Sequence, residues 1–235
     1  MSDHIVKAYD QDIAQLKTML AEMGGLAEEQ LDKAVSALSR HDRELADQVI
    51  KGDERLDILE RQIEEKAILT IAKRQPMALD LREIMVAIRI ASDIERIGDL
   101  AKNTAKRTLA IQEPLPRKLS IGLSRMAAMA QAQLKDILDA FIRKDEEKAM
   151  AVWRADEDLD ALFNSIFREL LTYMMEDPRN ITLCTHLLFG AKNLERIGDH
   201  TTNIAENIYF LVYGKTITEG RPKKDITSSM NPMEK

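Results

Sequence analysis

The sequence has little of what β-sheets and membrane spans require. Among its 235 residues are only 9 Gly, 6 Pro and 4% aromatic residues, a composition that favours helices over strands. The most apolar stretch, residues 84–90, is interrupted by Arg89 and is far shorter than the roughly 20 apolar residues that cross a bilayer. We therefore expect an all-α protein that reaches a membrane only through a partner protein.

Cysteine and excess positive charge are scarce as well. Cys184 is the only cysteine, so no intramolecular disulfide can form, and its apolar surroundings indicate a core residue rather than a nucleophile. The net charge is −6 and the pI is about 5.4, which argues against direct binding to nucleic acid. The acidic, polar start lacks the basic and apolar regions of a signal peptide. These features predict a cytoplasmic protein.

What the sequence does contain is an internal repeat. Residues 95–99, Glu-Arg-Ile-Gly-Asp, recur unchanged at 195–199, an offset of 100. Upstream, residues 42–57 match 145–160 at an offset of 103, and the match includes a D-E-x-L-D motif in each copy. Two separate matches in the same order indicate two copies of one structural unit.

Each copy is predicted to form three helices. Apolar spacings of three and four, with Pro76 and Pro178 as helix-ending residues, place helices at 5–39, 43–73, 78–109, 118–143, 145–175 and 180–213. We expect Gly24 and Gly25 to weaken or kink the first of these. The Pro-containing segment near 113–116 marks a boundary. The prediction is therefore two tandem homologous three-helix bundles, at 1–113 and 114–214, followed by a flexible polar tail at 215–235.

Carboxylates lie beside the apolar seam in both copies. Residues four apart on a helix lie one above the other, so each E-R-I-G-D and each D-E-x-L-D motif presents a pair of acids. Clustered carboxylates about 4 Å apart repel by on the order of 1 to 4 kcal/mol per pair, and hard oxygen ligands suit magnesium, calcium, manganese or iron. We predict one metal site per copy, formed by Asp53, Asp57, Glu95 and Asp99 and by Asp156, Asp160, Glu195 and Asp199.

Two further pairs of residues bear on this prediction. Gly98 and Gly198 stand at the same point of both copies although glycine in a helix costs about 1 kcal/mol, which implies a close approach by a neighbouring helix or a ligand. Asn103 and Asn203, one turn further on, either bind the metal themselves, orient its ligands or are solvated. The competing interpretation is that the acids are solvated and simply pair with Arg55, Arg61, Arg96 or Lys102.

Together these motifs resemble the PhoU family over nearly the whole chain, from about residue 5 to residue 213. The resemblance implies a homodimer with multinuclear metal clusters at the acidic motifs, and leaves the ion open among iron, manganese, magnesium, calcium and zinc. It also implies a negative regulator of the phosphate-starvation (Pho) regulon and of phosphate uptake. Such a regulator has no enzymatic activity and couples the ATPase subunit of the phosphate ABC transporter to the sensor histidine kinase PhoR.

The residues alone leave other functions open. A di-metal carboxylate oxidase or a storage-type helical bundle would also use clustered acids, but the oxidase class needs Glu-x-x-His pairs, and the sequence has none. The four histidines are scattered, and His200, whose counterpart in the first copy is Leu100, is expected in packing or at the surface. A bundle with solvated acids and no metal is the remaining alternative.

Overall fold

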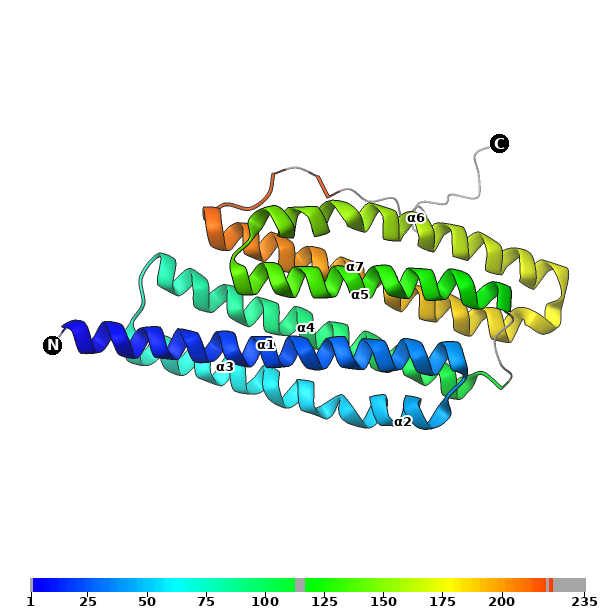
Figure 1. Ribbon diagram of the computed structural model, residues 1–235, viewed down its shortest axis with the longest axis horizontal. Coiled ribbons are helices and arrows are strands. Elements are labelled where there is room, and N and C mark those ends of the chain that lie inside the picture. Colours follow the sequence, from blue (N-terminus) through cyan, green and yellow to red (C-terminus); the bar gives the residue numbers. More distant parts are fainter. Residues whose placement is uncertain (1, 113–116, 219, 222–235) are drawn as a thin grey trace.

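Long helices build almost all of the described chain. The computed structural model describes residues 2–112, 117–218, 220 and 221, and these contain no strand, so the all-α prediction is confirmed. Figure 1 shows two bundles side by side, as predicted from the repeat. The elements are α1 Ser2–Arg40, α2 Arg43–Gly52, α3 Glu54–Arg74 and α4 Leu79–Ala110 in the first, and α5 Arg117–Arg143, α6 Glu146–Glu176, the 3-10 helix η1 Pro178–Asn180 and α7 Ile181–Tyr213 in the second.

The first two helices of each repeat are joined by the same turn. His41 and Lys144 adopt φ values of 54° and 53°. The next residue, Asp42 or Asp145, caps the following helix, because its side chain accepts a hydrogen bond from the backbone N–H three residues on, at 3.0 Å and 2.9 Å respectively. A cap of this kind contributes about 1 kcal/mol to helix stability. The repeat in sequence is thus a repeat in local structure.

The repeats differ in the helix that carries the D-E-x-L-D motif. The prediction of one helix over 43–73 is wrong, because α2 ends at Gly52, α3 begins at Glu54, and Asp53 lies in the turn between them. In the second repeat α6 runs unbroken, with Ala155 in place of Gly52. Glycine weakens a helix interior by about 1 kcal/mol relative to alanine, so this one exchange accounts for the position of the break.

Gly24 and Gly25 do not interrupt α1, which is continuous from Ser2 to Arg40. A Cβ atom at Gly24 would lie 2.9 Å from both terminal carbons of Leu138 on α5. Gly24 therefore allows α1 and α5 to approach closely, and the kink expected from the sequence is absent from this described helix.

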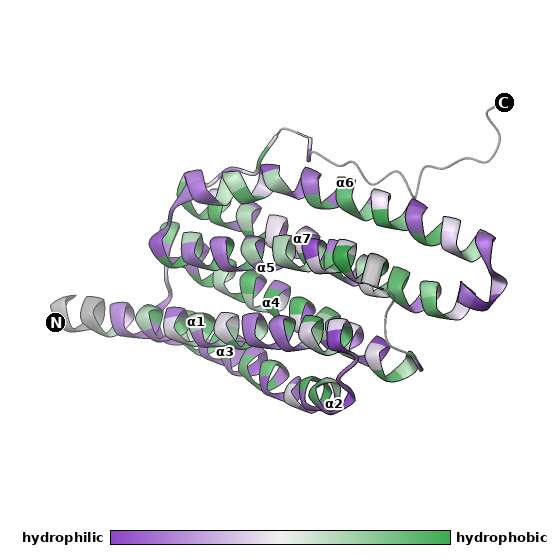
Figure 2. Ribbon diagram, turned by 45° about the vertical axis from the view of Figure 1, so that its right-hand side comes forward, coloured by the Kyte–Doolittle hydropathy of each residue, from purple (hydrophilic) through white to green (hydrophobic). Residues whose placement is uncertain are grey.

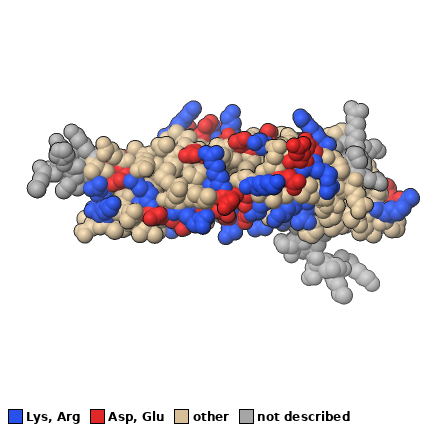
Figure 3. Space-filling view, turned by 90° about the horizontal axis from the view of Figure 1, so that it is seen from below, with Lys and Arg blue, Asp and Glu red and all other residues tan. Residues whose placement is uncertain are grey.

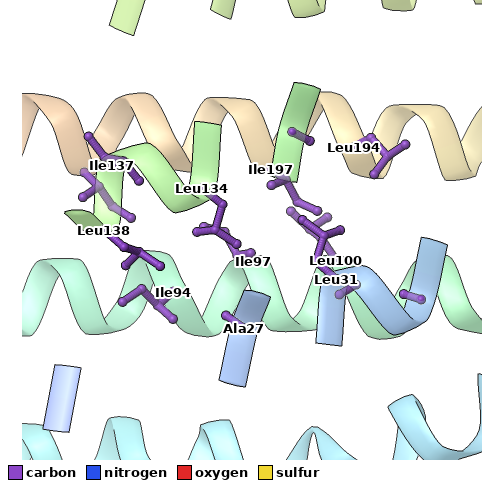
Figure 4. Close-up of a cluster of buried hydrophobic side chains, with 14 of the residues drawn as sticks. Ala27, Leu31, Ile94, Ile97, Leu100, Leu134, Ile137, Leu138, Leu194 and Ile197 are labelled. Carbon is purple, nitrogen blue, oxygen red and sulfur yellow. The ribbon is translucent and has the colours of Figure 1, made fainter. Parts of the chain in front are cut away.

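The two bundles share one hydrophobic core. Helix α4 packs along α7, and α1 packs along α5, with the two helices of each pair running in opposite directions (Figure 1). Figure 4 shows side chains from all four helices meeting there, among them Leu31, Ile97, Leu134 and Ile197. The predicted boundary at 113/114 lies outside the described residues. Because the core is continuous across both repeats, each bundle depends on the other for part of its burial.

Hydrophobic and hydrophilic residues alternate along the ribbons of the long helices (Figure 2). None of the described helices is long and apolar enough to cross a membrane.

Within the predicted tail at 215–235, two of the described residues contact the helices. Helix α7 ends at Tyr213, and the next residue, Gly214, caps it in the left-handed conformation, with a φ of 69° and a hydrogen bond of 2.9 Å from its N–H to the carbonyl of Phe210. After it, Ile217 packs against the core and Arg221 is half-buried. Residues 219 and 222–235 of the predicted tail lie outside the described part of the chain.

Candidate metal centres

All eight predicted acids are at least half-buried. The helices that carry them pack side by side within each repeat, α2 and α3 against α4 and α6 against α7, so each D-E-x-L-D motif faces the E-R-I-G-D motif of its own repeat. On the face shown in Figure 3, acidic and basic side chains intermingle. Asp53, Asp156, Asp160 and Glu195 are buried, whereas Asp57, Glu95, Asp99 and Asp199 are partly exposed.

In the first repeat a lysine bridges the two motifs. The Nζ of Lys102 donates a hydrogen bond to Asp53 and lies 2.5 Å from Oδ1 of Asp99. Nε of Arg96 lies 3.4 Å from Oε2 of Glu95, and Nη1 of Arg96 lies 3.7 Å from Oδ2 of Asp99. Two of the four basic residues weighed as simple partners therefore do pair with the acids. Asp53 is nevertheless only 5% exposed, so this is not a solvated acidic stripe.

Burial and mutual repulsion shift the carboxyl groups of this first cluster. Burial raises the pKa of Asp53, and the hydrogen bond from Lys102 only partly opposes that shift. Burial also raises the pKa of Glu95, followed by the charge of Asp99 and, more weakly, those of Glu60 and Asp57. The four predicted ligands are thus electrostatic neighbours.

In the second repeat an arginine from beyond α7 takes the bridging position. The Nη2 of Arg221 lies 3.3 Å from Oδ2 of Asp156 and 3.1 Å from Oδ1 of Asp199. The same nitrogen donates a hydrogen bond of 2.9 Å to the main-chain oxygen of Asp199. Sequence reasoning missed this residue, because a single arginine in a segment without apolar periodicity gives no local signal.

The second cluster is the more strongly perturbed of the two. Burial raises the pKa of Asp156 to about 7, with Arg221 opposing the shift and the charges of Asp160, Asp199 and Glu195 adding to it. Burial likewise raises the pKa of Glu195 to about 7, although Nζ of Lys192 lies 2.9 Å from its Oε1. These shifts place the carboxyl groups of Asp156 and Glu195 in a poorly hydrated environment, within reach of the charges of Asp160 and Asp199.

Each glycine of the E-R-I-G-D motifs makes room for a leucine and a glutamine, since a Cβ atom would overlap Leu56 at Gly98 and lie 2.5 Å from Leu159 at Gly198. A Cβ atom at Gly98 would lie 3.4 Å from Oε1 of Gln30, and one at Gly198 would lie 3.2 Å from Oε1 of Gln133 and overlap Oδ1 of Asp156. Both glutamines are buried. This pair was not predicted, although the offset of 103 that relates the two repeats also relates Gln30 to Gln133.

The side chains of both clusters offer oxygen ligands, which hard cations prefer, and some of the buried oxygen atoms near them have no hydrogen-bond partner among the described residues. Among the described residues, Oδ1 of Asp156, Oε2 of Glu195 and Oε1 of both Gln30 and Gln133 are buried without a hydrogen-bond partner. Unpaired buried acceptors are costly and attract a positive partner. However, within the described chain no three acidic, histidine or cysteine side chains are yet spaced to hold one ion. Ion binding would therefore require Lys102 or Arg221 to move and the carboxylates to close in.

The two asparagines proposed to orient the ligands differ in their surroundings. Asn203 donates a hydrogen bond of 3.2 Å to Oδ1 of Asp93 on α4, and Nδ1 of His200 lies 2.9 Å from the same oxygen. His200 and Asn203 thus belong to a polar contact between the bundles. Asn103 is half-buried on α4, and its role beside the first cluster stays a prediction.

Comparison with known proteins agrees with the duplicated fold. The family model described as PhoU domain matches residues 20–108 and 123–208. A phosphate-specific transport system accessory protein PhoU homolog from Rhizobium meliloti (strain 1021) is 57% identical, covering 97% of this chain and 96% of that protein. The accessory protein PhoU of Escherichia coli (strain K12) is 37% identical, covering 92% and 89%. A crystal structure of PhoU from Pseudomonas aeruginosa matches with a TM-score of 0.85 and 37% identity, covering 88% of this chain and 100% of that one. With both repeats matched, the chain belongs to the PhoU family.

Proposed function

We propose that this protein is an accessory regulator of a phosphate transport system, and that it works as a metal-binding adaptor rather than an enzyme. As a homodimer it contacts the ATPase subunit of the phosphate ABC transporter and the sensor histidine kinase PhoR, and it keeps the Pho regulon silent when phosphate is plentiful. The observation that carries this proposal is the family match across both repeats, to relatives whose names assign them to phosphate-specific transport.

A metal ion in each repeat would be held by Asp53, Asp57, Glu95 and Asp99, and by their counterparts Asp156, Asp160, Glu195 and Asp199. Such an ion supplies concentrated positive charge, which offsets the repulsion among the acids. The support for this part of the proposal is the burial of the carboxyl groups and the unpaired acceptor oxygens around them. Because the ligands come from two helices in each repeat, the ion would also fix those helices against each other.

The oxidase and storage alternatives gain no support. An oxidase of this kind needs histidines that ligate its metal, and the histidine next to the second cluster, His200, contacts Asp93 instead. Ferrous iron added without oxygen, followed by a measurement of oxygen consumption, separates the two functions: rapid turnover would exclude a pure adaptor.

The regulatory role is tested by deleting the gene. We expect phosphate-starvation genes to be expressed in phosphate-rich medium in the deletion strain and to be silenced again by the wild-type gene. Unchanged expression would reject the regulatory role. Affinity capture from membranes at high and low phosphate then tests the partners, because the transporter ATPase and PhoR should both be recovered.

The metal is tested separately. Protein purified without chelators should contain bound metal, and the double variant Asp99→Ala, Asp199→Ala should contain much less. An equal metal content in both proteins would reject the assignment of the sites, while leaving the regulatory role to the deletion experiment.

A further inference from the structure

In the second acidic cluster, the basic residue that bridges the two motifs lies outside the repeat. In the first repeat the bridging group, Lys102, belongs to the same helix as Asp99. At the equivalent position of α7 stands Thr202, which is buried and donates a hydrogen bond of 2.8 Å to the main-chain oxygen of Asp199. The second repeat thus has no lysine of its own at this point, and Arg221 stands in for it.

Two unrelated basic side chains therefore converge on equivalent carboxylates. Lys102 bridges Asp53 and Asp99, while Arg221 bridges Asp156 and Asp199, the counterparts of those two acids at offsets of 103 and 100. Lys102 belongs to helix α4, whereas Arg221 belongs to the segment that follows α7. The shared target is the pair of acids, which identifies the space between them as the cation position in both repeats.

The two cations differ in how they are attached. Lys102 is fixed to α4, so only its side chain can turn away. Arg221 follows the cap at Gly214 and lies outside any helix, on a segment whose Ile217 packs against the core. Its Nη2 contacts Asp156 and Asp199, and its Nε is buried without a partner among the described residues. Arg221 can therefore leave the cluster together with its segment without breaking any helical hydrogen bond.

The guanidinium also leaves the second cluster incompletely satisfied. Oδ1 of Asp156, Oε2 of Glu195 and Oε1 of Gln133 are buried and have no hydrogen-bond partner. Arg221 brings one positive charge to Asp156 and Asp199, whereas a divalent ion carries twice that charge and accepts oxygen ligands from several directions. A divalent ion can thus use oxygens that Arg221 does not reach.

We propose that Arg221 is a built-in competitor for the second metal site, so that a divalent cation and the segment after α7 exclude each other there. This inference rests on the proposed metal-binding function. It assigns the two sites different behaviour: the first site responds to the ion alone, while the second couples ion binding to release of Arg221 and the described residues 215–218. Loading of the second site is thereby converted into a change at the surface of the protein.

The test uses the full chain, stripped of metal with a chelator and titrated with Mn²⁺ alone, with free Mn²⁺ followed by electron paramagnetic resonance. Arg221→Ala should raise the affinity of one site by about threefold to tenfold, because a modest ion pair no longer holds the site closed. Lys215→Ala is the matched control, since it removes an exposed charge from the same segment, and it should bind Mn²⁺ as the wild type does. Adding Asp199→Asn to Arg221→Ala should remove the gain and so place it at the second site.

Hydrogen exchange gives an independent reading of the segment. In the wild type, Mn²⁺ should accelerate exchange in residues 215–218, whereas in Arg221→Ala exchange there should be fast with or without Mn²⁺. Equal Mn²⁺ affinity in the wild type and Arg221→Ala, with exchange unaffected by Mn²⁺, would overturn this inference and leave the metal-binding function intact. Failure of both proteins to bind Mn²⁺ would overturn the metal-binding function and this inference together.

Discussion

The two acidic clusters share their motifs and their place in the repeat, but water reaches them to different extents. In the first, Asp53 is the only buried acid of the four, and a further acid, Glu60, lies close enough to raise the pKa of Glu95. In the second, three of the four acids are buried, and Phe163 stands where the first repeat has Glu60.

That one exchange helps to explain why the second cluster is drier. Phe163 is 2% exposed, and Nζ of Lys192 lies 5.0 Å above its ring while also contacting Glu195. An aromatic ring removes water from the neighbouring carboxyl groups, and desolvation disfavours their charged form. The motif thus supplies the same ligands in both repeats, while the surrounding side chains decide how readily those ligands ionise.

The stronger burial of the second cluster predicts that the free energy of unfolding depends on pH through a carboxyl group of the second repeat. Burial raises the pKa of Asp156 from 3.8 to about 7, so the folded protein holds a proton that the unfolded chain has released. The resulting stabilisation is fully present below about pH 4 and is lost as the pH rises through about 7. In the presence of a chelator, urea denaturation should show a lower free energy of unfolding at pH 8 than at pH 5. Asp156→Asn should recover on the order of 2 kcal/mol at pH 8.

Asp53→Asn is the matched variant in the first repeat. Its recovery at pH 8 should be smaller, because burial raises the pKa of Asp53 while a hydrogen bond from Lys102 opposes that rise. Equal recovery by the two variants would mean that the clusters do not differ in hydration, and the comparison would fail.

The motif glycines give a second contrast. A Cβ atom at Gly198 would overlap Oδ1 of Asp156 and lie 2.5 Å from Leu159, whereas one at Gly98 would meet the end of Leu56 and only approach Gln30. Overpacking of this kind lowers the free energy of unfolding by about 1 to 3 kcal/mol. The higher helix propensity of alanine offsets up to about 1 kcal/mol of that loss.

Both alanine variants should therefore lower the free energy of unfolding, by roughly 1 to 2 kcal/mol in urea denaturation. Only Gly198→Ala should also weaken Mn²⁺ binding, since it displaces a carboxyl group rather than a methyl group. A loss of Mn²⁺ binding in Gly98→Ala alone would reverse the assignment.

Much of this architecture is predictable from the sequence because its causes are local or repeated. Apolar spacing sets the helices, and the repeated motifs set the acids on matching faces. The same comparison would have reached Gln30 and Gln133, since Gln-Leu recurs at the offset of 103. It could not reach Arg221, because contact between that residue and Asp156 depends on the path of a segment with no periodic pattern.

The contact between the bundles also escapes sequence reasoning. It joins Asp93 of one repeat to His200 of the other. Alignment of the two repeats identifies residues at equivalent positions, and it does not identify residues that contact each other. At the counterpart of Asp93, Nδ2 of Asn193 donates a hydrogen bond of 3.3 Å to Oγ1 of Thr104. A charged contact in one half of the interface thus corresponds to a neutral one in the other.

This asymmetry predicts unequal costs of removal. Asp93→Ala should lower the free energy of unfolding by about 1 to 2 kcal/mol, because it leaves two partly buried donors, on His200 and Asn203, without their acceptor. Asn193→Ala should cost about 0.5 to 1 kcal/mol, since one neutral hydrogen bond is lost. Urea denaturation of both variants near pH 7 measures the difference. Equal costs would show that the interface is symmetric in energy despite its sequence.

The substitution with the smallest expected effect is one that removes a structural difference between the repeats. Gly52→Ala gives the first repeat the residue that the second has at Ala155, and a Cβ atom there would make only ordinary contact, 3.7 Å from Nε2 of Gln30. Alanine is favoured over glycine in a helix by about 0.5 to 1 kcal/mol, so the variant should be more stable by that amount and should join α2 to α3 through Asp53. Slower amide exchange at residues 52–56 would detect the joined helix. Unchanged exchange and stability would instead mean that the turn is held by the surroundings of Asp53, including its bond to Lys102, and that the break serves the position of that carboxyl group.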